Sequence, residues 1–245
     1  MARSIDPAPK AVRGFVPARN DEERYLMRHI EDLARTASSR GIARYSGFLS
    51  DREQQLAQAA LNRTDMPEDE IRFDGGWPGA ERKLLCLEPV DSYPASPLCC
   101  VRLQCRALPG AQLPVHKDYL GSLMGLELRR EALGDIVLPE DQLGVAYVFA
   151  LEPAAELICQ ELRQAGHTDL TAEMQPLETL PAFPQAERPR QTATVSSLRL
   201  DAVLAAMLRC SRGMAAELVT AGRVEINHLP AESVHAPVYE DDVFT

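Results

Sequence analysis

Three short stretches near the C-terminus decide how this part of the chain folds: Leu198-Arg199-Leu200-Asp201, Ser211-Arg212 and Ala221-Gly222-Arg223-Val224-Glu225-Ile226-Asn227. Apolar residues recur at helical spacing after Arg199 and again after Arg212, whereas Val224 and Ile226 alternate as in a strand. We therefore expect two short helices followed by a β-hairpin. Arginines then stand at the starts of both helices and of the strand. Guanidinium groups in such positions suit phosphate binding better than catalysis.

Each expected element of this module carries local signals. Ser197 is a candidate N-cap of the first helix and Ser211 of the second, which Gly222 can end. Asp201 is better placed to orient a neighbouring arginine than to contact a ligand. The same spacing also fits a small helical hairpin with ordinary solvated arginines. The apolar residues expected to face inward are Leu200, Val203, Leu204, Met207, Met214, Ala215, Leu218 and Val219, with Val234 and Val238 in the hairpin.

A proline-rich stretch separates this module from the rest of the chain. Its prolines are Pro176, Pro181, Pro184 and Pro189. Because proline fixes φ and lacks a backbone donor, such a run favours neither a helix nor a central strand. We therefore expect a linker over residues 177–192 and a separate C-terminal domain over residues 193–245.

Residues 80–176 alternate between strand and helix signals. The expected strands cover residues 83–87, 98–106, 135–138, 145–150 and 168–174, and the expected helices cover residues 115–123 and 153–162. From Leu98 onward the order is β-α-β-β-α-β. This order predicts a ferredoxin-like domain, an architecture that RNA-recognition domains also use.

Residues 1–79 show mainly helical signals. Asn20 or Asp21 can cap a helix whose apolar residues recur at three- and four-residue spacing. Ser50 and Glu53 form a capping-box pattern before a second helix. The expected fold class is therefore α+β, with a helical N-terminal region, a ferredoxin-like (RNA-recognition-like) central domain and a small C-terminal helix-helix-hairpin domain.

The charge distribution limits the kinds of partner. The 245-residue chain has a formal net charge of −10, and residues 80–180 carry 8 basic and 15 acidic side chains. A generic nucleic-acid binder shows a basic excess instead. RNA binding by this chain therefore has to be local and matched in shape. The basic residues between Leu198 and Asn227 form such a local island: Arg199, Arg209, Arg212 and Arg223.

Composition also bears on compartment and cofactors. No run of about 18 apolar residues is present, which argues against a membrane span. The N-terminus lacks the apolar core of a secretory signal, so we expect a cytoplasmic protein. The six cysteines form no C-x-x-C pair and are expected to be reduced thiols rather than metal ligands. We expect no metal and no cofactor.

Residues 198–244 resemble the RNA-binding domain of the ribosomal-protein-S-four type, which folds as two helices and a β-hairpin. Upstream motifs, in the same order, are similar to the YlmH family of bacterial RNA-binding proteins, and the resemblance covers residues 20–245. The motifs are FLSDREQ (48–54), GGWPGAERK (75–83), HKDYLGSL (116–123), LRREALGDI (128–136) and TVSSLRLD (194–201).

The resemblance implies a non-enzymatic RNA-binding protein that associates with the ribosome. Members of the family are implicated in the rescue of large ribosomal subunits that still carry peptidyl-tRNA, and their genes lie beside cell-division genes in many bacteria. The implied partners are ribosomal RNA and peptidyl-tRNA. The implied roles are ribosome-associated quality control or translation-linked cell division, and we expect a monomer.

The resemblance also implies a set of RNA-facing residues. In the C-terminal domain they are Arg199, Ser211, Arg212, Arg223 and Asn227, and in the central domain they are His116, Lys117, Tyr119, Arg129 and Arg130. The central set has an alternative reading from the residues themselves. His116 and Lys117 can present donors at a helix start and Tyr119 can stack on a base. Alternatively, Tyr119 belongs to the core and His116 caps the helix, while Arg129 and Arg130 are a solvated pair.

Three features depart from the family pattern. Met214 stands where members often have lysine, which removes one phosphate contact. Glu240-Asp241-Asp242 replaces a Gly-Asp turn and adds an acidic residue. The chain stops at Thr245, where the resemblance implies a last strand and a basic tail, so we expect the domain to lack its last strand.

Two other functions fit parts of the sequence. The acidic balance and the short C-terminus fit a protein-interaction or cell-division factor whose RNA-binding module is degenerate. Arg199-Leu200-Asp201 matches the Arg-Leu-Asp of pseudouridine synthases, in which the aspartate is the nucleophile. In those enzymes the motif lies inside a large catalytic domain, whereas only 44 residues follow Asp201 here.

Overall fold

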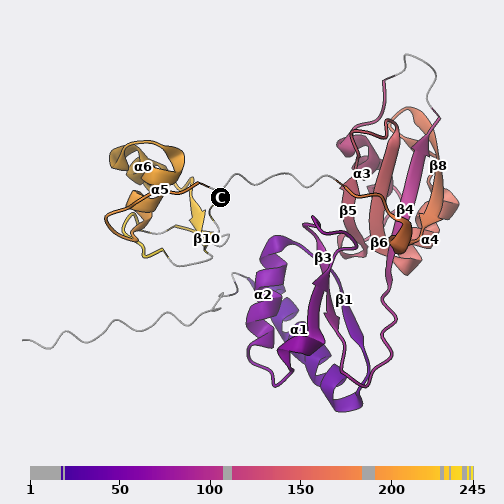
Figure 1. The fold of residues 1–245 in the computed structure, drawn as a ribbon, viewed down its shortest axis with the longest axis horizontal. Helices are drawn as coiled ribbons and strands as arrows, with labels where there is room; N and C mark the ends of the chain where they lie inside the picture. Colours follow the sequence, from indigo (N-terminus) through magenta and orange to yellow (C-terminus); the bar gives the residue numbers. More distant parts are fainter. Residues whose placement is uncertain are drawn as a thin grey trace, which may run out of the picture. The chain divides into compact units, whose positions relative to one another are not determined.

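The chain divides into two compact units, residues 1–185 and residues 186–245, as drawn in a computed structural model (Figure 1). The division falls within the stretch predicted to be a linker. The structure describes residues 18, 20–106, 112–183, 191–226, 229–231, 233–238, 242 and 244.

The first unit begins with a helical layer on a three-stranded antiparallel sheet whose strand order is β1-β3-β2. Its elements are α1 (Asp21–Arg40), β1 (Arg44–Leu49), α2 (Asp51–Leu61), η1 (Glu68–Glu70), β2 (Ile71–Asp74) and β3 (Lys83–Leu87). Asn20 caps α1 by accepting from the Glu23 backbone N–H at 2.8 Å. Ser50 and Glu53 form the predicted capping box at the start of α2.

This region contains more sheet than the sequence analysis predicted. Strand β1 was not expected, because a bulge between Tyr45 and Phe48 interrupts its pairing and buried residues cluster at its end instead of alternating. Strand β3 was assigned to the central domain, yet it pairs with both β1 and β2. Residues 80–87 therefore belong to the N-terminal sheet.

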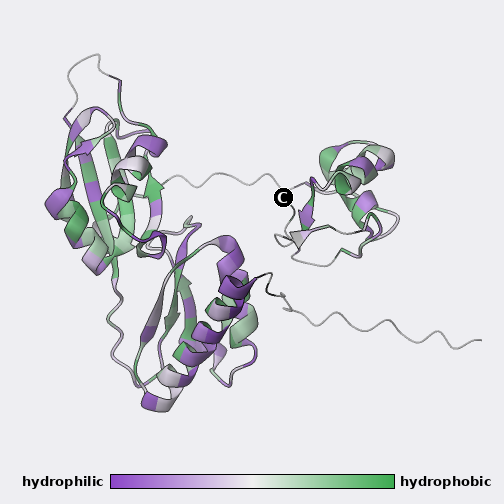
Figure 2. Ribbon diagram, turned by 180° about the vertical axis from the view of Figure 1, so that it is seen from behind, coloured by the Kyte–Doolittle hydropathy of each residue, from purple (hydrophilic) through white to green (hydrophobic). Residues whose placement is uncertain are grey.

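The ferredoxin-like order predicted from Leu98 onward is confirmed. The elements are β4 (Leu98–Cys105), α3 (His116–Met124), η2 (Arg130–Ala132), β5 (Leu133–Val137), β6 (Val145–Leu151), α4 (Glu152–Glu161), β7 (Gln164–Ala165) and β8 (Thr168–Gln175). The strands form one antiparallel sheet in the order β5-β6-β4-β8-β7. Figure 2 shows apolar strands in this sheet and a largely polar α1.

Helices α3 and α4 cover one face of the central sheet. Their buried side chains, including Tyr119, Leu123 and Ile158, pack against Val101 and Val148 of the two middle strands β4 and β6. The opposite face carries Tyr147 and Phe149. It packs against residues of the N-terminal sheet and against the segment after β8, so the sheet is covered on both sides.

The start of the predicted linker takes part in this packing. After β8 the chain forms a short 3₁₀ turn, η3 (Leu177–Thr179). Leu177, Leu180 and Phe183 then pack on the face that carries Tyr147 and Phe149. Residues 177–183 are therefore held on the first unit.

Asp135 of β5 organises the turn that precedes β3. Its carboxylate accepts from the backbone N–H groups of Glu81 and Arg82 at 2.8 and 3.1 Å. It also accepts from the indole N–H of Trp77 at 3.2 Å. One carboxylate thus ties the central sheet to the turn 75–82.

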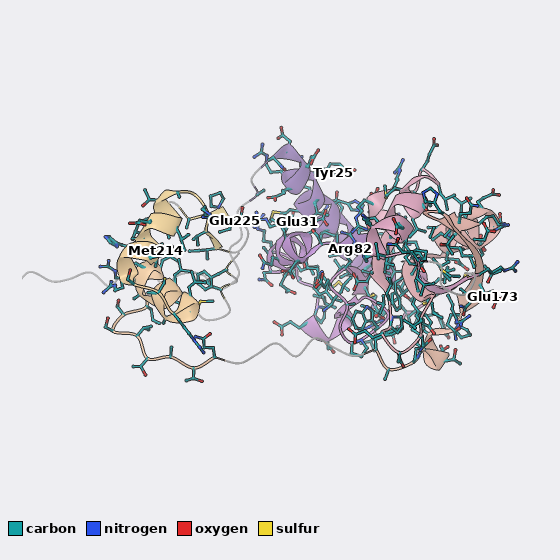
Figure 3. All side chains as sticks on the ribbon, turned by 90° about the horizontal axis from the view of Figure 1, so that it is seen from above. Tyr25, Glu31, Arg82, Glu173, Met214 and Glu225 are labelled. Carbon is teal, nitrogen blue, oxygen red and sulfur yellow. The ribbon has the colours of Figure 1, made fainter. Side chains whose placement is uncertain are left out.

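Arg82 completes this joint from the other side (Figure 3). Its guanidinium donates to the carbonyl oxygens of Phe48, Leu133 and Arg130 at 2.9 to 3.1 Å. Burial lowers the pKa of Arg82. The Arg82 side chain therefore links the two sheets, because its guanidinium donates to backbone carbonyls of β1 and of β5.

The second unit is a small helical hairpin followed by a β-hairpin, as predicted, but the strand Glu225–Ile226 pairs with Leu229–Pro230 rather than with the stretch of Val234 and Val238. Its elements are α5 (Leu200–Leu208), α6 (Arg212–Thr220), β9 (Glu225–Ile226) and β10 (Leu229–Pro230). Phe244 forms an isolated antiparallel bridge with Ile226, so residues near the end of the chain add to this hairpin. The buried core consists of Leu200, Leu204, Ala205, Ala215, Val219, Val224 and Val238.

Two further features concern the described residues as a whole. No helix in that part of the chain is both long and apolar enough to cross a membrane. The same residues contain no group of three or more His, Cys, Asp or Glu side chains arranged to hold a metal ion. The six cysteines are free thiols.

The close packing at the joint predicts a matched pair of glycine variants. A Cβ added to Gly134 would lie 2.5 Å from the buried Phe48 ring, so Gly134→Ala should destabilise the first unit by about 1–3 kcal/mol. A Cβ on the exposed, helical Gly121 would meet nothing within 4 Å, so Gly121→Ala should stabilise by about 0.5–1 kcal/mol. Urea unfolding followed by the fluorescence of Trp77, the single tryptophan, measures both. Equal effects would contradict this account of the joint.

Candidate nucleic-acid interface

The first helix of the second unit is capped by distant backbone rather than by a side chain. Arg199 is its N-cap residue and makes no side-chain cap bond. The backbone N–H groups of Leu200 and Asp201 donate to the carbonyls of Ala236 and Val234 at 2.9 and 3.1 Å. The predicted Ser197 cap is therefore wrong, because these carbonyls already satisfy the helix start. The contact also brings residues 234–236 beside Arg199.

Ser211 caps the second helix as predicted. Its hydroxyl accepts from the Met214 backbone N–H at 3.2 Å, and α6 begins at Arg212. The cap fixes where the helix starts, and this sets the direction in which the Arg212 side chain leaves the backbone. Ser211 and Arg212 are both exposed.

Asp201 joins the two helix starts. Its carboxylate accepts from the Nε and Nη2 of Arg199, both at 3.2 Å, and from the Nε and Nη2 of Arg212 at 3.2 and 2.6 Å. The Asp201 side chain is only 8% exposed. The interpretation that Asp201 orients a neighbouring arginine is confirmed, and it orients two.

The electrostatics of this group follow from its contacts. The hydrogen bond from Arg199 is the main cause that lowers the pKa of Asp201 from its usual range to about 2, and Arg212 adds to it against the opposing effect of burial. Asp201 is therefore ionised at neutral pH. One negative charge holds two positive ones, which leaves the cluster with a net charge of +1.

Both guanidinium groups remain accessible on one side. The side chains of Arg199 and Arg212 are 41% and 52% exposed, although each has an edge against Asp201. Nη2 of Arg199 also contacts Nδ1 of His235. His235 had no predicted role, since no local pattern links it to a residue 36 positions away. The structure therefore presents two oriented, half-exposed cations.

The remaining predicted residues of this unit are less closely joined. Arg223 is exposed and follows Gly222, whose φ of 67° is the left-handed conformation that glycine favours. The structure thus places Arg223 on the surface between α6 and β9. Asn227 lies outside the described residues.

Met214 was predicted to face the core, but it is 51% exposed (Figure 3). Ala215 and Val219 occupy the buried face of α6, and a helix turns about 100° per residue, so position 214 points away from that face. An apolar side chain therefore lies on the surface one turn from the Ser211 cap.

The central candidates do not form one site. Tyr119 is 1% exposed and its hydroxyl lies 3.0 Å from the Cys105 Sγ, so it cannot stack on a base. Burial raises its pKa. The alternative that Tyr119 belongs to the core is confirmed. The proposed capping role of His116 is wrong, because Val115 is the N-cap residue and the Asp118 carboxylate accepts its N–H at 2.9 Å.

The charged central candidates lie at two ends of α3. His116 and Lys117 are exposed in its first turn. Arg129 and Arg130 follow its last turn, where Arg129 is 85% exposed and 3.9 Å from Glu131, and the Arg130 carbonyl belongs to the Arg82 joint. These residues are solvated side chains on separate surfaces rather than a gathered cluster.

Comparison with known proteins agrees with the architecture of the second unit. Residues 198–244 match the model of the S4 domain, and this range contains both helices, the hairpin and the arginine cluster. The fold and the cluster thus define an S4-domain protein.

A second comparison covers nearly the whole chain. The chain is 31% identical over 230 residues to the ribosome-associated protein quality control protein P2 of Bacillus subtilis. The matched stretch covers 93% of this chain and 86% of the relative. The chain therefore belongs to the YlmH family. The solved cell division protein ylmH from Streptococcus pneumoniae has a similar fold, with a TM-score of 0.51 and 13% identity over 68% of this chain and 99% of that one.

The low pKa of Asp201 predicts a pH-dependent contribution to stability. Because the folded pKa of about 2 lies below the ordinary value of about 3.9, the ionised carboxylate stabilises the fold above about pH 4. This contribution is lost as the pH falls towards 2. We expect Asp201→Asn to lower the unfolding temperature at pH 7, and the deficit to shrink between about pH 4 and pH 2.

Calorimetry of the full chain measures this difference. Glu217→Gln removes a carboxylate from the exposed surface of α6 and is the matched control. A deficit for Asp201→Asn that stays constant down to pH 2 would show that the charge of Asp201 is not what stabilises the unit.

Proposed function

We propose that this chain is a non-enzymatic RNA-binding protein that associates with the ribosome and acts in ribosome-associated quality control. The observation that carries the proposal is the pair of half-exposed guanidinium groups that one buried carboxylate holds at the starts of α5 and α6.

The geometry favours RNA phosphate as the ligand. Guanidinium forks bind phosphate oxygens through paired hydrogen bonds, and a rigid pair loses little entropy on binding. Asp201 already restricts the rotation of both arginines, so much of the ordering cost is met within the fold. Ser211 and Arg223 lie on the exposed surface of the same small unit.

The relatives support the ribosome as the setting. The Bacillus subtilis protein is named for ribosome-associated quality control, and its similarity extends over both units. On this basis we propose ribosomal RNA as the principal partner, with peptidyl-tRNA as a further ligand. We also propose a cytoplasmic location and a monomeric state.

The environment of Asp201 argues against a pseudouridine-synthase activity. A catalytic nucleophile needs a carboxylate that can reach its substrate. Here the carboxylate is 8% exposed and accepts four hydrogen bonds from two arginines. These contacts support a positioning role for Asp201 instead.

Charge reversal of both arginines tests the proposed function. Arg199→Glu with Arg212→Glu should abolish co-sedimentation with ribosomes, because it replaces two phosphate ligands by repelling charges around Asp201. Binding of the unaltered chain should weaken steeply between about 50 and 200 mM salt, as counterion release requires.

The control applies the same change of charge to α1. Arg24→Glu with Arg35→Glu alters two exposed arginines whose partners are single aspartates on the same helix, and it should leave binding nearly unchanged. Ribosome association that survives reversal at 199 and 212 would refute the site. No association of the unaltered chain at any salt would favour a protein-interaction factor instead.

Asp201→Asn separates positioning from charge. It makes the unit more positive by one charge, so attraction alone predicts tighter binding. If Asp201 acts by holding the two guanidinium groups, binding should instead weaken by roughly 3–10-fold. The dissociation constant for ribosomes or ribosomal RNA at fixed salt decides the matter, and tighter binding would contradict the positioning role.

A further inference from the structure

Phe183 occupies an aromatic surface on the central sheet. It is 9% exposed and meets three rings edge to face. Its centroid lies 5.6 Å from that of Trp77, 5.0 Å from that of Tyr147 and 6.3 Å from that of Phe149. Tyr147 and Phe149 belong to β6, a middle strand of the sheet, and Trp77 belongs to the turn before β3.

This surface is the sheet face turned away from α3 and α4. Sheets of this architecture bind single-stranded RNA by stacking bases on aromatic rings of their middle strands. In this chain the corresponding rings are buried. Phe183 lies over Tyr147, whereas Phe149 is also covered by the turn at Gly76, where an added Cβ would lie 2.5 Å from its ring. An aromatic side chain of the protein therefore occupies the position that a base would take.

The segment that carries Phe183 is anchored mainly by side chains. Leu177, Leu180 and Phe183 are the side chains that anchor residues 177–183 on this face. Within the described ranges, the hydrogen bonds of this segment stay between residues 175 and 180. Among the described backbone groups, none of this segment is hydrogen-bonded to β4 or β6 beneath it, so its three apolar side chains hold it on this face.

Positive groups lie beside the covered rings. Arg102 on β4 pairs in register with Tyr147, so the two side chains share one face. Lys83 lines, with Trp77, an open pocket of about 420 Å³. Arg72 lines it as well, but its guanidinium is paired with Asp74 and Glu88. The central domain is acidic as a whole, but Arg102 and Lys83 place positive charge near Tyr147 and Trp77.

We propose that residues 177–183 form a strap that closes a second RNA site on the central domain. When the strap is displaced, Trp77 and Tyr147 stack unpaired RNA bases, and the nearby cations contact the phosphates. With the strap in place, RNA binding is confined to the S4 domain. The proposal is independent of the arginine cluster, because the two sites lie in different units.

The experiment uses the full chain with Arg199→Glu and Arg212→Glu, so that the S4 domain contributes no binding. Adding Phe183→Ala removes the ring that lies over Trp77 and Tyr147. Trp77 is the single tryptophan, so its fluorescence reports on this surface alone. We expect stronger quenching of Trp77 by acrylamide, and a further fluorescence change on titration with an oligouridine. The oligouridine should bind the Phe183→Ala chain at least about tenfold more tightly than the chain that retains Phe183. The reason is that the state with the strap displaced is then no longer a minor population.

Two further variants guard against misfolding. Leu180→Ser loosens the strap without touching the aromatic rings, and should shift both readouts in the same direction as Phe183→Ala. Phe183→Leu keeps an apolar side chain over the rings and should stay close to the chain that retains Phe183. Duplex RNA of equal length, whose bases are already stacked, should give no change of fluorescence.

Two results would overturn the proposal. The first is equal quenching of Trp77 fluorescence by acrylamide with and without Phe183. This result would show that the strap does not cover the surface. The second is that acrylamide quenching increases in both Phe183→Ala and Leu180→Ser, but oligouridine does not change the fluorescence of Trp77. Either result would leave the role of the S4 domain unaffected, because that domain is silenced throughout.

Discussion

The arginine cluster of the S4 domain depends on one buried carboxylate. Asp201 is nearly inaccessible, and its two oxygens accept from two guanidinium groups that begin two different helices. Without it, Arg199 and Arg212 would be independent flexible side chains on an acidic protein. With it, they become a paired and partly immobilised surface. A net charge of −10 can therefore coexist with a local affinity for phosphate, because the attraction is short-ranged and shaped by contact.

The motifs that connect this chain to its family divide into two kinds. The motifs around residues 75–83 and 128–136 meet at the joint between two sheets, where Asp135 and Arg82 satisfy backbone groups. The role of Asp135 and Arg82 is structural, since their polar atoms are used within the fold. The motif at residues 194–201 instead leads to exposed guanidinium groups. Similarity in a motif therefore does not by itself distinguish a binding residue from a packing residue.

Much of the fold could be predicted because its signals are local. Caps at Asn20 and Ser50, helical spacing and the β-α-β-β-α-β order all depend on residues a few positions apart. Strand β1 was not predicted, because a bulge and burial on both faces remove the alternation of apolar and polar residues that marks a strand. The inward orientation of Tyr119 and the outward orientation of Met214 also could not be settled locally. Each depends on which helix face meets a neighbour, and that neighbour is set by the whole domain.

The sequence alone determined the type and order of most elements, the separate C-terminal module and the positions of its arginines at helix starts. Only the tertiary structure decided which of these groups act together. It brought Asp201 between Arg199 and Arg212, placed His235 beside them and laid Phe183 over the central sheet. The physical reason is range: helix and strand signals arise between near neighbours, whereas shared hydrogen bonds and stacked rings join residues that are distant in the chain.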